Sequence, residues 1–79
     1  MLNVTILNQK RTIYEGKAKS VFLPGDEGEF EVLPFHKPLL SLLQKGRIII
    51  DANKSVELTR GIVRVFNNEL VVLIEDLFI

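Results

Sequence analysis

The sequence has no cysteine among its 79 residues. Disulfide bonds, thiolate metal sites and a cysteine nucleophile are therefore excluded, and the absence suits a reducing compartment. An excess of charge of one sign is also missing, because ten basic and ten acidic residues cancel. A neutral chain lacks the excess of positive charge that attracts nucleic acid or an anionic membrane surface, so we expect neither as a direct partner.

Long apolar runs are absent as well. No segment approaches the roughly 18–20 apolar residues that cross a bilayer as a helix, so we expect no direct membrane insertion. The opening residues MLNVTILNQK lack the basic stretch followed by an apolar stretch that marks a secretory signal. Helical spacing is confined to residues 39–43, and their short length favours a strand or a turn over a helix.

The sequence does contain apolar alternation with a period of two. Leu2, Val4 and Ile6 alternate with polar residues, which is typical of a strand with one solvent-exposed face. Because turn residues separate many such runs, we predict a single all-β domain over residues 1–79, a small sandwich of two packed sheets with about eight to ten short strands. The predicted strands cover residues 2–6, 12–15, 17–23, 29–32, 39–43, 47–51, 55–60, 62–66 and 69–74.

Glycine, proline and asparagine mark the ends of several of these strands. Pro24 and Gly25 are predicted to end the strand over residues 17–23, because proline cannot donate a hydrogen bond to a ladder. Gly61 indicates a bend or a bulge. The pair at residues 67–68 is Asn-Asn, which tolerates a left-handed backbone and suits a two-residue hairpin turn.

Two of the predicted strands are apolar on both faces, at residues 48–50 and 71–74. This pattern fits central strands of packed sheets, or strands with one face on the core and the other on a partner. The last three residues are also large and apolar. They indicate either a final strand tucked into the core or a patch that a partner covers, and they are Leu77, Phe78 and Ile79.

Residues 25–40, GDEGEFEVLPFHKPLL, contain most of the side chains that could take part in acid–base chemistry or metal binding. Paired carboxylates can divide acid and base roles, and His36 is the one histidine available to a base or a metal site. However, no apolar pocket that would raise a carboxyl pKa is indicated. A solvated turn and an interface histidine are the simpler interpretation. The carboxylates concerned are Asp26, Glu27, Glu29 and Glu31.

We therefore predict no catalytic residue, no cofactor and no metal site in the chain, this segment included. Its glycines allow a tight turn, and the residues before Pro34 and Pro38 are pushed to extended conformations. The segment is thus a stiff edge that can dock a partner with little loss of entropy. The alternatives are an ordinary sandwich turn, and a small enzyme or metal protein that uses His36.

The same run resembles the N-terminal β-sandwich of the epsilon subunit of F-type ATP synthases. That family carries a run close to G-x-E-G-E-h-x-h-x-P-x-H-x-P-L-L, where h is apolar. Residues 2–25, 46–48 and 61–63 are also similar to the family, so the resemblance covers the whole chain. The residues that fit the run in order are Gly25, Glu27, Gly28, Glu29, Phe30, Val32, Pro34, His36, Pro38, Leu39 and Leu40.

The sequence departs from the family pattern in three respects. Glu31 and Phe35 stand where the family usually has small residues, mostly glycine, and Phe35 makes the loop bulkier. Lys37 stands where the family often has alanine. Members also usually continue into a C-terminal helical hairpin, whereas this sequence stops near the end of the sandwich. Auto-inhibition of ATP hydrolysis and any ATP binding belong to that hairpin, so by analogy we expect neither here.

The resemblance implies a non-catalytic rotor component at the foot of the central stalk, on the cytoplasmic face of a bacterial inner membrane. Its partners would be the gamma subunit and the loops of the c-ring, and it would help couple proton or sodium flow to rotation. A stand-alone β-sandwich interaction module is the alternative. The implied contact residues are Glu27, Gly28, Glu29, His36 and Lys37 toward the c-ring, and Leu77, Phe78 and Ile79 toward gamma.

Overall fold

Alternating and β-branched residues form strands along nearly all of the chain. The structure is a computed structural model that describes residues 1–75, and these residues contain nine strands and no helix. The strands are β1 (Leu2–Leu7), β2 (Thr12–Ala18), β3 (Val21–Gly25), β4 (Gly28–Val32), β5 (Leu39–Leu43), β6 (Gly46–Ile50), β7 (Lys54–Leu58), β8 (Arg60–Phe66) and β9 (Glu69–Glu75).

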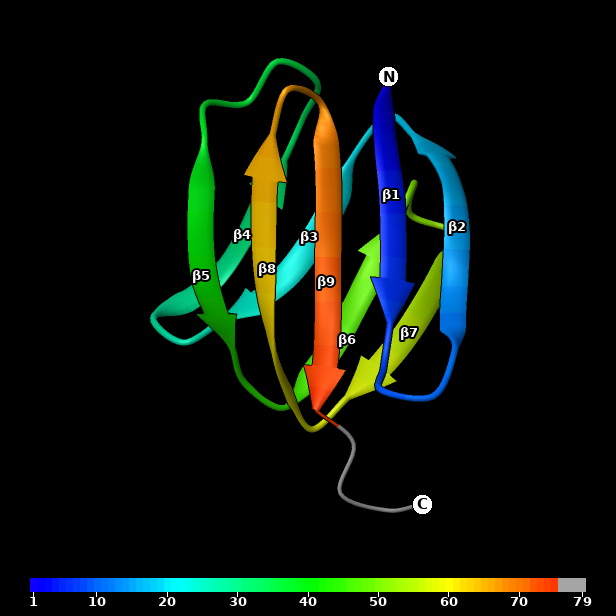
Figure 1. Ribbon diagram of the computed structural model, residues 1–79. Helices are drawn as coiled ribbons and strands as arrows, with labels where there is room; N and C mark the ends of the chain where they lie inside the picture. The colour runs from blue at the N-terminus through cyan, green and yellow to red at the C-terminus, as the bar shows by residue number, and fades with distance from the viewer. Residues whose placement is uncertain (76–79) are drawn as a thin grey trace.

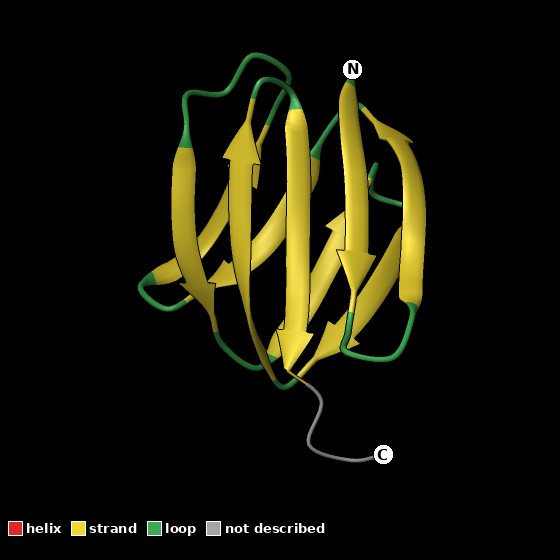
Figure 2. Ribbon diagram, in the orientation of Figure 1, coloured by secondary structure: helices red, strands yellow, loops and turns green. Residues whose placement is uncertain are grey.

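The strands lie in two layers that face each other (Figures 1 and 2). One layer has the order β2-β1-β9-β8-β5, and we call it the front layer. The other, the back layer, contains β3, β6 and β7 in that order, with β4 on the free side of β3. A single paired position, Gly25 with Leu43, joins β3 to β5, so the layers form one continuous sheet that folds over on itself. The predicted all-β sandwich is confirmed.

The core lies between the two layers and follows from the alternation in each strand. In β1, Leu2, Val4 and Ile6 are buried, and β9 pairs with β1 in parallel so that Leu70 faces the core beside Val4. No polar or charged side chain in residues 1–75 is buried. The remaining side chains of the hydrophobic core are Ala18, Val21, Leu23, Val32, Leu43, Ile48, Ile50, Leu58, Val63, Val65, Val72 and Ile74.

One predicted strand, over residues 17–23, is wrong. Lys17 and Ala18 end β2, and β3 begins only at Val21, after a turn at residues 19–20. The cause is a residue about thirty positions away in sequence. The Asp51 carboxylate accepts hydrogen bonds from the backbone N–H groups of Lys19, at 2.7 Å, and Ser20, at 3.0 Å. The backbone N–H of Asp51 also donates to the Ser20 carbonyl oxygen at 3.0 Å. Asp51 therefore fixes the turn.

Replacing Asp51 by alanine should therefore destabilise the fold. Two backbone donors lose a charged acceptor, which costs about 1–3 kcal/mol, and the thermal midpoint should fall by about 4–8 °C for each kcal/mol. Asp51→Asn is the matched control, because it keeps one acceptor oxygen and tolerates the left-handed φ of 52° at this position. Thermal unfolding by circular dichroism measures both, and an Asp51→Ala midpoint equal to that of the wild type would contradict this role.

Three further local predictions have different outcomes. Pro24 and Gly25 belong to β3 as its last two residues, so the strand ends at Gly25 and not before Pro24, and the Pro24 carbonyl oxygen accepts a hydrogen bond from the Gln44 N–H at 2.9 Å. Gly61 is not at a bulge, because its pairing with Leu43 and Ile74 is regular on both sides, and the bend in the backbone lies two residues earlier, at Thr59. The hairpin turn at residues 67–68 is confirmed, with φ values of 52° and 61°, and residues 39–43 form a strand.

Candidate functional site

The acidic turn, residues 25–29, joins β3 to β4 in a tight hairpin. Gly25 pairs with Gly28, and a Cβ atom on Gly25 would lie 2.7 Å from the Gly28 carbonyl oxygen. Gly28 has a φ of +128°, which side chains other than hydrogen rarely allow. The glycines therefore close the turn and leave the carboxylates of Asp26, Glu27 and Glu29 exposed to solvent.

The same turn lies against β5 of the front layer. The Asp26 N–H donates to the Leu42 carbonyl oxygen at 3.1 Å. The turn and the strand together line a hollow of about 560 Å³, formed by residues 25–30 and 39–42. The exposed carboxylates thus stand beside the apolar side chains Leu40 and Leu42, which are 67% and 58% exposed.

The proline loop, residues 33–38, joins β4 to β5 and is fixed by three hydrogen bonds. Asn68 Oδ1 in the β8–β9 turn accepts the Phe35 N–H at 2.6 Å, and the Leu33 carbonyl oxygen accepts the His36 N–H at 3.2 Å. His36 Nδ1 donates to the Lys37 carbonyl oxygen at 2.7 Å. Phe35 has a left-handed φ of 67° and is 86% exposed, so its ring points away from the loop.

The structure groups the residues predicted to face the c-ring into two sets. Glu27, Gly28 and Glu29 lie together in the acidic turn, whereas His36 and Lys37 lie in the proline loop. These lie at opposite ends of β4, which spans about 17 Å at 3.3–3.4 Å per residue. In Figure 1 the loop is at the top and the turn at the lower left. The residues predicted to face gamma, Leu77, Phe78 and Ile79, lie outside the described residues.

Sequence reasoning missed a row of apolar side chains on the outer face of the front layer. Leu42 of β5 is paired with Ile62 of β8, Ile62 with Leu73 of β9, and Leu73 with Leu7 of β1. We call these four residues the outer apolar row. Leu42 and Leu73 are 58% and 46% exposed, and the other two are half-buried. The row crosses four adjacent strands, so it forms one continuous apolar strip.

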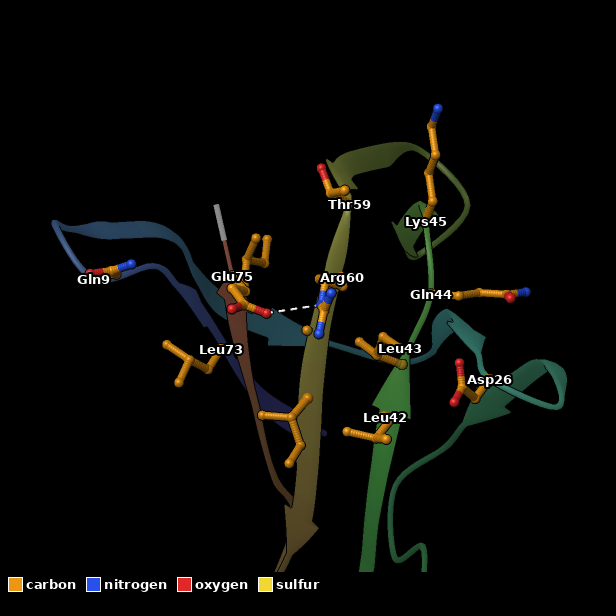
Figure 3. A pocket seen from close by; sticks show the side chains of 13 residues that line it. Gln9, Asp26, Leu42, Leu43, Gln44, Lys45, Thr59, Arg60, Leu73 and Glu75 are labelled. Carbon is orange, nitrogen blue, oxygen red and sulfur yellow. Dashed lines mark ion pairs between the residues drawn. The ribbon is translucent and has the colours of Figure 1, made fainter. Parts of the chain in front are cut away.

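Three of the four residues of this row, Leu42, Ile62 and Leu73, line a hollow of about 640 Å³ formed by β5, β8, β9 and the adjoining turns. Figure 3 shows Leu42, Leu43 and Leu73 on its apolar side and Arg60 with Glu75 beside them. The Arg60 Nε lies 2.9 Å from the Glu75 Oε1. Polar side chains surround the apolar floor, which is the usual arrangement of a protein-binding patch with a polar rim. Besides Arg60 and Glu75, the polar residues are Gln9, Asp26, Gln44, Lys45 and Thr59.

The outer face of the back layer is different. Its corresponding row runs from Glu31 of β4 through Phe22 and Ile49 to Ser55 of β7, so polar residues stand at both ends. An exposed ion pair, with the Arg47 Nε 3.7 Å from the Glu57 Oε2, also lies on this layer. The front layer therefore presents the longer unbroken apolar strip, which marks it as the candidate partner-binding face.

Residues 1–75 contain no group of three or more histidine, cysteine, aspartate or glutamate side chains placed to hold a metal ion. Within the same residues, no helix is long and apolar enough to span a bilayer. The features that stand out are surfaces: the acidic turn, the proline loop and the outer apolar row.

A family model described as ATP synthase, Delta/Epsilon chain, beta-sandwich domain matches residues 1–78. A relative from Sulfurimonas denitrificans, named ATP synthase epsilon chain, is 45% identical over an alignment of 78 positions that covers 94% of this chain and 60% of the relative. A relative of the same name from Nitratiruptor sp. is 41% identical with the same coverage. The chain thus spans about 60% of the length of the curated relatives it matches.

Solved structures show the same fold at low sequence identity. A chain in the central stalk and c-ring structure of Tetrahymena thermophila mitochondrial ATP synthase has a TM-score of 0.79 at 16% identity, covering 95% of this chain and 63% of that one. A chain in the Euglena gracilis mitochondrial ATP synthase structure has a TM-score of 0.81 at 18% identity, covering 92% and 49%. Because the family model spans nearly all of the sequence, the chain belongs to the ATP synthase delta/epsilon family, as its β-sandwich domain.

Proposed function

We propose that this chain is a non-catalytic central-stalk subunit of a rotary F-type ATP synthase. It links the gamma subunit to the c-ring and helps couple ion flow to ATP synthesis, without chemistry of its own. The observation that carries the proposal is the outer apolar row on a sandwich whose relatives are named ATP synthase epsilon chains. In a bacterial cell it works at the cytoplasmic face of the inner membrane, as a peripheral part of the complex.

The gamma subunit is assigned to the front layer. An apolar strip across four strands gains free energy when a partner removes it from water, at about 25 cal/mol for each Å² of apolar area. Strands from several parts of the sequence support the strip, so it is rigid before binding and loses little entropy on docking. The wild-type chain should therefore bind purified gamma at micromolar concentration in an isothermal titration. A stand-alone interaction module would not bind it.

The c-ring is assigned to the edge that carries β4 and β5, with the acidic turn and the proline loop as its contacts. The carboxylates of Glu27 and Glu29 are exposed and can form charge-assisted hydrogen bonds to basic or amide groups on the c-ring loops. Lys37 supplies a donor at the other end of β4, beside the His36 ring, whose Nδ1 donates to the Lys37 carbonyl oxygen. The separation of the two sets means that they contact different parts of the ring, such as loops of neighbouring c subunits.

Charge reversal at Glu29 tests this second assignment. Glu29→Lys should weaken assembly of the gamma–chain complex with detergent-solubilised c-ring by about tenfold or more, because a hydrogen bond to a charged group contributes about 1.5–3 kcal/mol. Glu57→Lys on β7 makes the same charge change at an exposed position on the back layer, and should leave assembly unchanged. Co-elution over a concentration series measures both. Equal retention of the two variants would rule out the acidic turn as a c-ring contact.

A further inference from the structure

Arg64 of β8 is a cation placed in the middle of apolar surface. On the outer face of the front layer it is paired with Leu40 on β5 and with Val71 on β9. Its two neighbours on the same face of β8 are Ile62 and Phe66, and Phe66 is 55% exposed. All four positions that flank this side chain across and along the sheet are therefore occupied by apolar residues.

The guanidinium of Arg64 forms no ion pair within residues 1–75, where the ion pairs join Arg47 to Glu57 and Arg60 to Glu75. The acidic residue closest in register is Glu69, which stands opposite Phe66 and so only diagonally from Arg64. By contrast, Arg60 on the same strand and face is paired with Glu75 at 2.9 Å. Arg64 also lines a shallow groove of about 500 Å³ as its one charged residue, with Pro38, Leu39, Leu40, Val65 and Phe66.

Water satisfies the guanidinium while this face is open. Once a partner covers the apolar neighbours, the charge loses that water, and a buried charge without a counter-charge strongly disfavours the complex. Arginine is also among the side chains that most often dominate binding at the centre of an interface. A partner that binds the front layer tightly must therefore bring an anionic group to this position.

We propose that the partner covering the front layer presents a carboxylate to Arg64, with apolar side chains beside that carboxylate filling the groove between β5 and β8. The inference rests on the proposed function, which makes the gamma subunit this partner. It adds the chemistry of the contacting segment: an aspartate or glutamate flanked by large apolar residues. The groove supplies the apolar side of this recognition and Arg64 the charged side.

Charge reversal gives the first test. Arg64→Glu should raise the Kd for purified gamma about 30-fold or more, since disrupting a buried interfacial charge pair typically has at least that effect. Arg64→Lys keeps the charge and should lose less affinity for gamma than Arg64→Glu does. Arg11→Glu, in the exposed β1–β2 turn, makes the same change away from the face and should bind like the wild type. If gamma binds wild type and Arg64→Glu equally, this inference is wrong while the proposed function stands.

The Arg64→Lys variant gives the second test, because its amine can be joined by a zero-length carbodiimide to a carboxylate in contact with it. Mass spectrometry of the complex with gamma should find a cross-link from position 64 to one acidic residue of gamma. Arg11→Lys serves as the background control. Reversing that acidic residue to lysine should restore binding to Arg64→Glu. A cross-link to a second copy of this chain, or none above background, would overturn the inference, and loss of wild-type binding to gamma would overturn the proposed function with it.

Discussion

Replacing Leu42 and Leu73 together by glutamine is expected to lower the affinity of the chain for the gamma subunit about 100-fold. The two side chains are the most exposed members of the outer apolar row, and Ile62 lies between them in register. A loss of about 100-fold corresponds to about 2.8 kcal/mol for the two residues together, and truncating a well-packed residue at the centre of an interface can cost about 2 kcal/mol or more. Glutamine also leaves an amide to be desolvated where a leucine had been, so the loss combines both effects. Isothermal titration with purified gamma measures it.

Phe22→Gln is the matched control for this prediction. Phe22 is 40% exposed, close to the 46% of Leu73, but it lies on the outer face of the back layer beside Glu31. The same apolar-to-amide change there should leave the Kd for gamma within about twofold of wild type. If the control weakens binding as much as the double variant does, gamma does not recognise the front layer in particular and the assignment of faces is wrong.

Replacing Leu70 by alanine is expected to lower the free energy of unfolding by about 2–5 kcal/mol. Leu70 is fully buried, and in register it lies between Val4 on β1 and Val65 on β8, both also buried. A 79-residue domain has a total stability of about 4–12 kcal/mol, at 0.05–0.15 kcal/mol per residue. The cavity therefore removes a large share of the stability, and urea unfolding should show a much lower midpoint.

Leu40→Ala provides the same chemical change at a surface position. Leu40 is 67% exposed on the outer face of the front layer, so its truncation should change the free energy of unfolding by no more than about 0.5 kcal/mol. Equal destabilisation by the two variants would contradict the division of the front layer into a core face and an open face. That division is the basis of the candidate interface.

The many short alternating runs, such as residues 2–6, and the turn residues between them, such as 67–68, predict an all-β sandwich and many of its strands, since both signals are local. The misplaced boundary at residues 17–23 has a non-local cause. Nothing near Lys19 or Ser20 specifies a turn, and the carboxylate that fixes it belongs to Asp51. The parallel pairing of β1 with β9 is equally invisible to local patterns, because it joins the two ends of the described chain.

The candidate site was predictable to a similar extent. The acidic turn and the proline loop are continuous in sequence and contain glycine, proline and histidine, so the sequence identifies both. Their separation by the length of β4 depends on the fold. The outer apolar row is harder to predict, because its four residues come from four separate strands and meet only through register. Its one local signal was the apolar residues on both faces of 71–74, which fit a strand between the core and a partner.

Phe35 stands where the family usually has a small residue, mostly glycine, and its backbone has a left-handed φ of 67°. Glycine adopts this backbone conformation without strain, and phenylalanine adopts it at a cost of about 1–2 kcal/mol. The hydrogen bond of 2.6 Å from the Phe35 N–H to Asn68 Oδ1 holds the conformation in place. The loop thus keeps a backbone shape that suits glycine, while the exposed ring adds apolar surface at the end of the molecule.

The most direct test of the account is the affinity of the unmodified chain for the gamma subunit of the same organism. Titration of purified gamma with the wild-type chain should give a one-to-one complex at micromolar concentration or below, with the negative heat-capacity change that accompanies burial of apolar surface. Absence of binding at that concentration, with both proteins folded, would contradict the assignment of the chain to the central stalk.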